Sequence, residues 1–98
     1  MRTIYKYNLA PVDEQTIGLH KNYEILSVQN QHGMITLWVM IDTDQLMTEV
    51  VFYVVGTGNP MPPRRFINFL GSVQIPPFVW HVFVERKWTP PEQTNPPS

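Results

Sequence analysis

The chain has 98 residues, 43% of them hydrophobic and 15% charged, with a formal net charge of −1. This length predicts a single domain with its own core, and the near-neutral charge lacks the basic footprint that binding to DNA or RNA requires. The charged fraction lies below the usual value of about 25%. We therefore expect either a homo-oligomer, in which a second copy covers part of the surface, or a surface of Asn, Gln and Thr.

Cysteine is absent from the sequence, which excludes a disulfide framework, a thiolate zinc site and a cysteine nucleophile. Its absence fits a reducing cytoplasm. The first residues, Met1 to Lys6, lack the apolar core of a signal peptide. No apolar run approaches the roughly 20 residues of a membrane-spanning helix. We expect a protein that does not bind membranes and stays in the cytoplasm.

The apolar positions are mostly β-branched or aromatic, and Ala10 is the only alanine, so strands are favoured over helices. Seven segments have strand composition: Arg2–Leu9, Thr16–Leu19, Tyr23–Gln31, Met34–Ile41, Leu46–Val55, Phe66–Ile75 and Phe78–Arg86. This pattern predicts an all-β fold, a small antiparallel β-sandwich or a partly open barrel. We expect one β-domain over residues 1–88 and a disordered proline-rich tail over residues 89–98.

Several details of this sheet structure are also predicted. The dipeptide His32-Gly33 indicates a hairpin between two strands. The segment Met34–Ile41 is apolar on both faces, so we expect a central strand covered on both sides. Leu26 and Val28 should point to one face of their strand. Gly71 should mark a bulge or bend.

The sharpest change of composition follows Val55, where Gly56-Thr57-Gly58-Asn59 leads into a proline-rich turn and then Arg64-Arg65. The prolines exclude the helix that a phosphate-binding loop of the strand–glycine–helix kind needs. What remains is a turn whose N–H groups could form an anion nest, followed by guanidinium forks that match phosphate geometry. Alternatively, the glycines only permit the turn and the arginines protect a strand edge.

Trp80 and His81 complete the set of candidate ligand-binding residues. If they share a rim with Arg64 and Arg65, the four would form a stacking and charge-assisted pocket for a nucleotide. The alternative is that Trp80, like Trp38, belongs to the core and His81 is a hydrogen-bonded strand residue. The candidate site residues are therefore Gly56, Thr57, Gly58, Asn59, Arg64, Arg65, Trp80 and His81.

Catalysis and metal binding find little support in the residue pattern. The three histidines, His20, His32 and His81, share no metal-ligand spacing. Ser27 and Ser72 do not lie on the sharp strand-to-helix turn of a hydrolase nucleophile. We expect no enzyme, no metal site and no cofactor.

A group of short motifs runs along most of the chain: IYKYNL (4–9), ILSVQ (25–29), LW with Asp42 (37–42), GTGNP (56–60), FLGSVQ (69–74) and VWHVF (79–83). Their order and spacing resemble a family of small uncharacterised proteins from tailed bacteriophages and prophages. The resemblance implies a viral origin and expression in a bacterial cytoplasm, and it assigns no catalytic residues. Arg64-Arg65-Phe66 and the proline-rich tail depart from the family's pattern.

Three functions follow, in decreasing order of support. The first is a phage-encoded, non-enzymatic counter-defence protein that, as a homo-oligomer, sequesters a small anionic signal of the nucleotide type or blocks a host protein. The second is a virion structural, decoration or assembly protein. The third is an enzyme acting on a small substrate.

Overall fold

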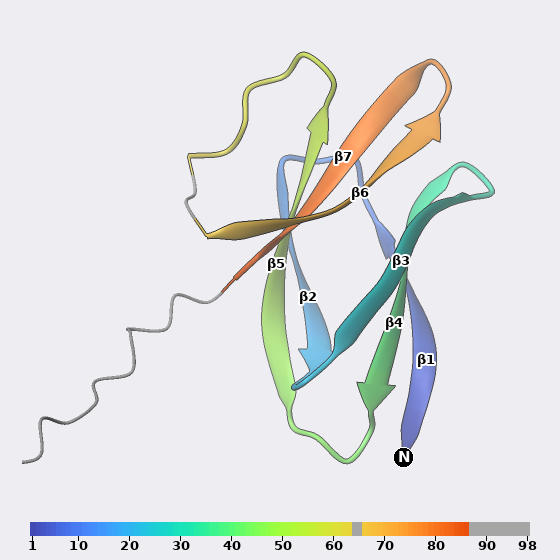
Figure 1. The fold of residues 1–98 in the computed structure, drawn as a ribbon, viewed down its shortest axis with the longest axis vertical. Coiled ribbons are helices and arrows are strands. Elements are labelled where there is room, and N and C mark those ends of the chain that lie inside the picture. The colour runs from blue at the N-terminus through green and yellow to red at the C-terminus, as the bar shows by residue number, and fades with distance from the viewer. Residues whose placement is uncertain (64–65, 87–98) are drawn as a thin grey trace, which may run out of the picture.

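The computed structural model describes residues 1–63 and 66–86, which form an all-β fold with strands that pair only antiparallel (Figure 1). The predicted all-β class and sandwich architecture are confirmed. The strands are β1 (Arg2–Leu9), β2 (Glu14–His20), β3 (Glu24–Gln31), β4 (Met34–Asp42), β5 (Met47–Gly56), β6 (Ile67–Ile75) and β7 (Phe78–Glu85).

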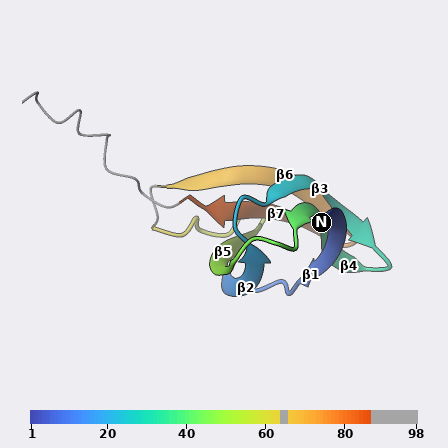
Figure 2. The same ribbon diagram turned by 90° about the horizontal axis from the view of Figure 1, so that it is seen from below.

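The strands make a three-stranded sheet of order β1-β4-β3 and a four-stranded sheet of order β2-β5-β7-β6. Hairpins join β3 to β4 and β6 to β7, while the other connections pass between sheets or, from β5 to β6, to the sheet's edge. The predicted hairpin at His32-Gly33 is confirmed, with His32 and Gly33 at φ angles of 54° and 81°. Figure 2 shows the two sheets end on, with β3 and β6 on the same side.

The core lies between the sheets because alternate residues of each strand point inward. From the three-stranded sheet come Leu9, Ile35, Leu37, Val39 and Ile41; from the four-stranded sheet come Leu19, Val50, Phe52, Val54, Val73, Val82 and Val84. All are less than a tenth exposed. The sheet edges β3 and β6 adjoin, since the Asn30 amide donates to the Gln74 carbonyl over 3.0 Å.

Two predicted details need correction. The register of β3 against β4 shifts between Ile25 and Ser27, so Leu26 is 46% exposed while Val28 packs toward the core. The bulge adds one residue and breaks the alternation that would have put both side chains on one face. Strand β4 is central, as predicted, but its outer face is not fully covered, because Trp38 is half-buried.

The predicted bulge near Gly71 is confirmed by a register shift between Phe69 and Gly71 in the pairing of β6 with β7. The predicted tail, residues 89–98, lies outside the described part of the chain, as do Arg64 and Arg65. Across residues 1–63 and 66–86 there is no helix long and apolar enough to cross a membrane.

Candidate functional site

The loop between β5 and β6 begins with a tight turn over residues 56–59. The Asn59 N–H donates to the Gly56 carbonyl over 3.0 Å, and the Thr57 N–H donates to the Val79 carbonyl over 3.2 Å. Gly58 has a φ of 90°, which favours glycine at the third position of such a turn. Two of the N–H groups expected to form an anion nest therefore donate within the protein, which weakens that interpretation of the turn.

Gly56 is the point at which this loop approaches the sheet. It pairs with Trp80 across β5 and β7 and is buried. A Cβ atom at Gly56 would lie 2.8 Å from the Asn59 side-chain nitrogen and 3.2 Å from the Trp80 ring. The absence of a side chain is what lets Asn59 and Trp80 pack so closely over this backbone.

His81 joins the loop to the neighbouring strand through two hydroxyl groups. Its Nε2 lies 2.8 Å from the Thr57 hydroxyl oxygen, and its Nδ1 lies 2.7 Å from that of Ser72 on β6. In a neutral imidazole one nitrogen donates a hydrogen bond and the other accepts one. In that form one hydroxyl donates a hydrogen bond to the ring and the other hydroxyl accepts one from it. Since hydroxyls occupy both nitrogens, His81 has no ring nitrogen left for the carboxylate of a Ser-His-Asp arrangement.

Trp80 and His81 do not share a face of the sheet. As neighbours on β7 they point to opposite sides: Trp80 packs against the core cluster, with its ring centroid 5.5 Å from that of Phe78. His81 lies on the outer face with Thr57 and Ser72. Trp80 and His81 therefore lie on opposite faces and not on one rim, which favours the alternative interpretation of both residues, while Arg64 and Arg65 lie outside the described residues.

A cavity of about 490 Å³ lies beneath the β5–β6 loop, on the outer face of the four-stranded sheet. Tyr53 and Val55 of β5 line it and are only 2% and 8% exposed. The opposite walls come from the loop and from the start of β2: Asn59, Pro60, Met61, Pro62, Pro63, Asp13 and Glu14. The segment predicted to bind a ligand thus forms one wall of a half-open cavity whose volume is large enough for one.

The charged side chains described around this cavity are acidic. Asp13 and Glu14 place two carboxylates at its wall. Arg64 and Arg65 follow Pro63 directly in the sequence but lie outside the described residues. The predicted set therefore divides: Asn59 lines the cavity, Gly56 and Thr57 hold the loop against β7, His81 bonds to Thr57 without lining the cavity, and Trp80 packs against the core. Within the described ranges no group of three His, Asp or Glu side chains could hold a metal ion.

A family model described as a domain of unknown function, DUF7352, matches residues 1–93. The chain belongs to the DUF7352 family. Searches of curated proteins and of solved structures returned no significant match. The expected membership of an uncharacterised family is confirmed, and a phage origin stays a prediction.

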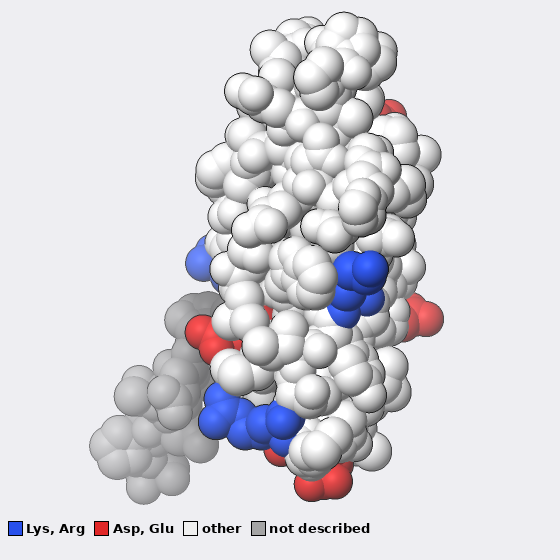
Figure 3. Space-filling model, turned by 90° about the vertical axis from the view of Figure 1, so that its right-hand side faces the viewer, with Lys and Arg blue, Asp and Glu red and all other residues white. Residues whose placement is uncertain are grey.

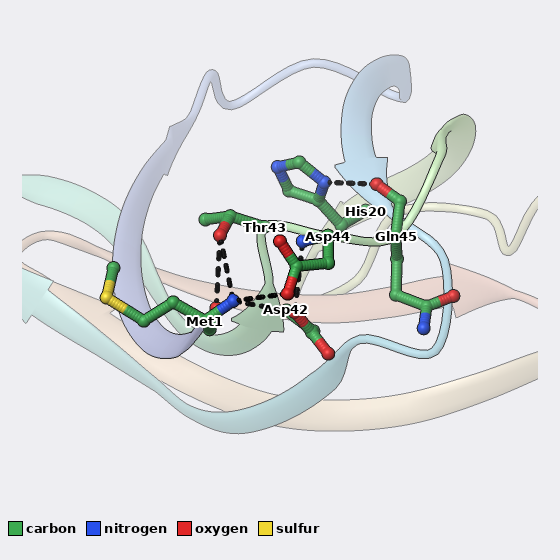
Figure 4. A network of polar contacts seen from close by, with 6 residues as sticks. All are labelled: Met1, His20, Asp42, Thr43, Asp44 and Gln45. Carbon is green, nitrogen blue, oxygen red and sulfur yellow. Dashed lines mark hydrogen bonds and ion pairs between the residues drawn. The ribbon is translucent and has the colours of Figure 1, made fainter.

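A second polar cluster in this DUF7352 protein was not predicted from the sequence (Figure 4). The α-ammonium group of Met1 lies 3.1 Å from Asp42 and 2.9 Å from Asp44, at the turn between β4 and β5. Hydrogen bonds to Asp44 and Asp42 raise the pKa of this amine above its ordinary value of 8.0. His20 joins the same turn through Nδ1, 2.8 Å from the Gln45 carbonyl oxygen. The register Arg2 to Asp42 creates the cluster, and register is not visible in local composition.

Proposed function

We propose that this protein is a non-enzymatic binding protein that works as a homo-oligomer in a bacterial cytoplasm and holds a small anionic ligand of the nucleotide type. The observation that supports it best is the cavity of about 490 Å³ under the β5–β6 loop. Its volume falls within the range of about 300–1,000 Å³ typical of small-molecule sites.

The cavity's lining suits such a ligand at one end. Tyr53 offers an aromatic wall, Met61 and the prolines offer apolar contact, and the Asn59 amide can donate and accept hydrogen bonds. Asp13 and Glu14 suit sugar hydroxyls but repel phosphate. Arg64 and Arg65 directly follow the lining residue Pro63 in the sequence, and we assign to their guanidinium groups the charge that would oppose the phosphate.

The setting of this function rests on the motif resemblance described above. A phage or prophage protein that binds and sequesters a nucleotide signal would inhibit a host defence that depends on that signal, and it would need no catalytic activity to do so. Blocking a host protein is the other form of the same proposal. The Phe69 side chain is 59% exposed and offers such a host protein an apolar contact.

Isothermal titration calorimetry with a panel of cyclic nucleotides and ADP-ribose derivatives tests the ligand. At least one nucleotide class should bind, and Arg64→Ala/Arg65→Ala should weaken its binding by more than about 10-fold, because charge-assisted hydrogen bonds are lost. Met61→Glu should weaken it too, by adding a carboxylate to the cavity wall. The matched control is Leu46→Glu at the β4–β5 turn, where the replaced side chain is also exposed, at 73% against 52% for Met61.

Two results would overturn this proposal. One is the absence of heat with every nucleotide in the panel. The other is equal weakening by Met61→Glu and Leu46→Glu, which would attribute the effect to net charge and not to the cavity. Stoichiometric amounts of the protein in purified virions, measured by mass spectrometry, would favour a structural role instead.

A further inference from the structure

Two long segments of the sequence carry no formal charge. Residues 25–41 and 66–84 contain no Lys, Arg, Asp or Glu, although charged residues flank each of them closely. The first segment covers almost all of the β3–β4 hairpin and the second almost all of the β6–β7 hairpin. Such a distribution is unusual for surface hairpins, whose outer faces commonly hold charges.

The fold brings these two hairpins together, although they belong to different sheets. The Cβ of Val28 lies 3.6 Å from where a Gly71 Cβ would be, and Asn30 donates to the Gln74 carbonyl. Their tips point to the same end of the molecule (Figure 1). We call residues 28–36 and 72–80 the uncharged end. Figure 3 shows one face on which the lower half carries the charges and the upper half, toward this end, is nearly free of them.

The uncharged end exposes both apolar and amide side chains. Phe78 is 57% exposed and Met34 is 44% exposed. Phe78 directly follows the Pro76-Pro77 turn, and its ring rests on Trp80 at a centroid distance of 5.5 Å, which fixes its position. The same two segments contain three glutamines: Gln29 and Gln74 are exposed, and Gln31, which pairs with Met34, is partly exposed.

We propose that the uncharged end is the surface through which two copies of this chain associate, about a two-fold axis. A two-fold interface brings the same patch of each copy together, so any charge near the axis meets a like charge, and a patch without charges avoids this repulsion. An amide group both donates and accepts, so glutamines can pair with their own copies. Rigid aromatic residues such as Phe78 are the side chains that most often dominate interface energy.

The two open sheet edges are less suited to self-association. The open sheet edges are β1 and β2. Lys6 and Arg2 lie on β1, and Glu14 opens β2, so an interface at either edge would take charged side chains out of water. Charged residues on edge strands are a common means of preventing edge-to-edge pairing. The inference deepens the homo-oligomer part of the proposed function and rests on that part alone.

Sedimentation velocity over a concentration series tests the surface with two variants. The wild type should sediment as a dimer, and Phe78→Lys should raise the dimer dissociation constant by about 30-fold or more, as expected for an interface hot spot. Leu46→Lys is the matched control, because Leu46 is 73% exposed in the β4–β5 turn; it should dimerise like the wild type. Equal melting temperatures for the two variants establish that both are folded.

A mixing experiment examines the two-fold axis. Phe78→Lys and Phe78→Glu should each be monomeric alone and should form a mixed dimer when combined, since opposite charges then meet across the axis. A wild type that is monomeric throughout the series, or a Phe78→Lys variant that dimerises like the control, overturns the inference. If Phe78→Lys abolishes dimerisation but no nucleotide gives a calorimetric signal with the wild type, the dimer surface stands and the proposed ligand falls. The two failures are therefore distinguishable.

Discussion

Strands β4 and β5 have the same kind of sequence, apolar on both faces, yet the protein covers them differently. Their inner faces are equally buried, with Leu37 and Phe52 both at 0% exposure. On the outer faces, Tyr53 of β5 is 2% exposed, whereas Trp38 of β4 is half-buried. The difference arises because the β5–β6 loop and the start of β2 flank this face of β5 and form the half-open cavity there.

Strand β4 is covered instead by the long side chains of its neighbour β1. The Lys6 ammonium lies 6.0 Å from the centre of the Trp38 ring, and the Arg2 guanidinium lies 3.2 Å from the Met40 sulfur. Such side chains lay their methylene groups on apolar surface while the charge stays in water. The apolar outer face of a strand can thus be covered in two ways. A loop covers β5 and forms a cavity with it, whereas long cationic side chains cover β4.

The largest expected effect comes from truncating the aromatic residue on each outer face. Tyr53→Ala should lower the free energy of unfolding by about 3–5 kcal/mol, since it leaves a void beside the cavity. Trp38→Ala, at a half-buried position, should cost about 1–2 kcal/mol. Urea unfolding at constant m-value measures both. Equal losses would mean that the loop contributes no more to the burial of β5 than Lys6 contributes to that of β4.

A smaller effect should follow from adding one methyl group where the loop approaches the sheet. Gly56→Ala places a Cβ 3.2 Å from the Trp80 ring and 2.8 Å from the Asn59 nitrogen, so overpacking should cost about 1–3 kcal/mol. Gly18→Ala is the control, because its nearest neighbour, the Met47 methyl, is 3.5 Å away, an ordinary contact. Urea midpoints that do not differ between these variants would contradict the close packing of the loop on β7.

The positions of the strands along the chain were predictable because they follow from local sequence patterns. Alternation, the Gly33 and Pro76-Pro77 turns and the β-branched runs located all seven strands within a few residues of their observed bounds. The bulge at Leu26 was not predictable, because it depends on pairing with β4 and leaves no mark in the composition of β3. The same holds for the contact of Val28 with Gly71, which joins two hairpins from different sheets.

The candidate site was predictable as a segment but not as a set of contacts. The Gly/Pro composition located the loop, and Asn59 does line a cavity. The sequence suggested that Trp80 and His81 act together, although neighbours on a strand point to opposite faces. Tyr53, Asp13 and Glu14 were missed as lining residues, because only the fold brings the start of β2 and the middle of β5 beneath the loop.

The smallest expected effect concerns the end of the molecule opposite the uncharged end, where the Met1 amine contacts Asp42 and Asp44. Because the pKa of this amine is raised above 8.0 in the folded chain, its stabilising contribution is fully present below pH 8.0 and is lost as pH rises through the raised value. The pKa of Asp42 is lowered from 3.8, first by the hydrogen bond from the Asp44 N–H and then by the amine. The Asp42 contribution is therefore present above pH 3.8 and is lost as pH falls through the lowered value.

Acetylating the Met1 amine removes its charge and should isolate this contribution. The melting temperature of the acetylated chain should lie slightly below that of the unmodified chain between about pH 5 and 7, where amine and carboxylates are all charged. The difference should shrink at alkaline pH, where the amine of the unmodified chain also loses its charge, and in high salt, because the pair is exposed. A difference that is unchanged by pH and salt would mean that the acetyl group acts on the β1–β4 pairing by its bulk and not through charge.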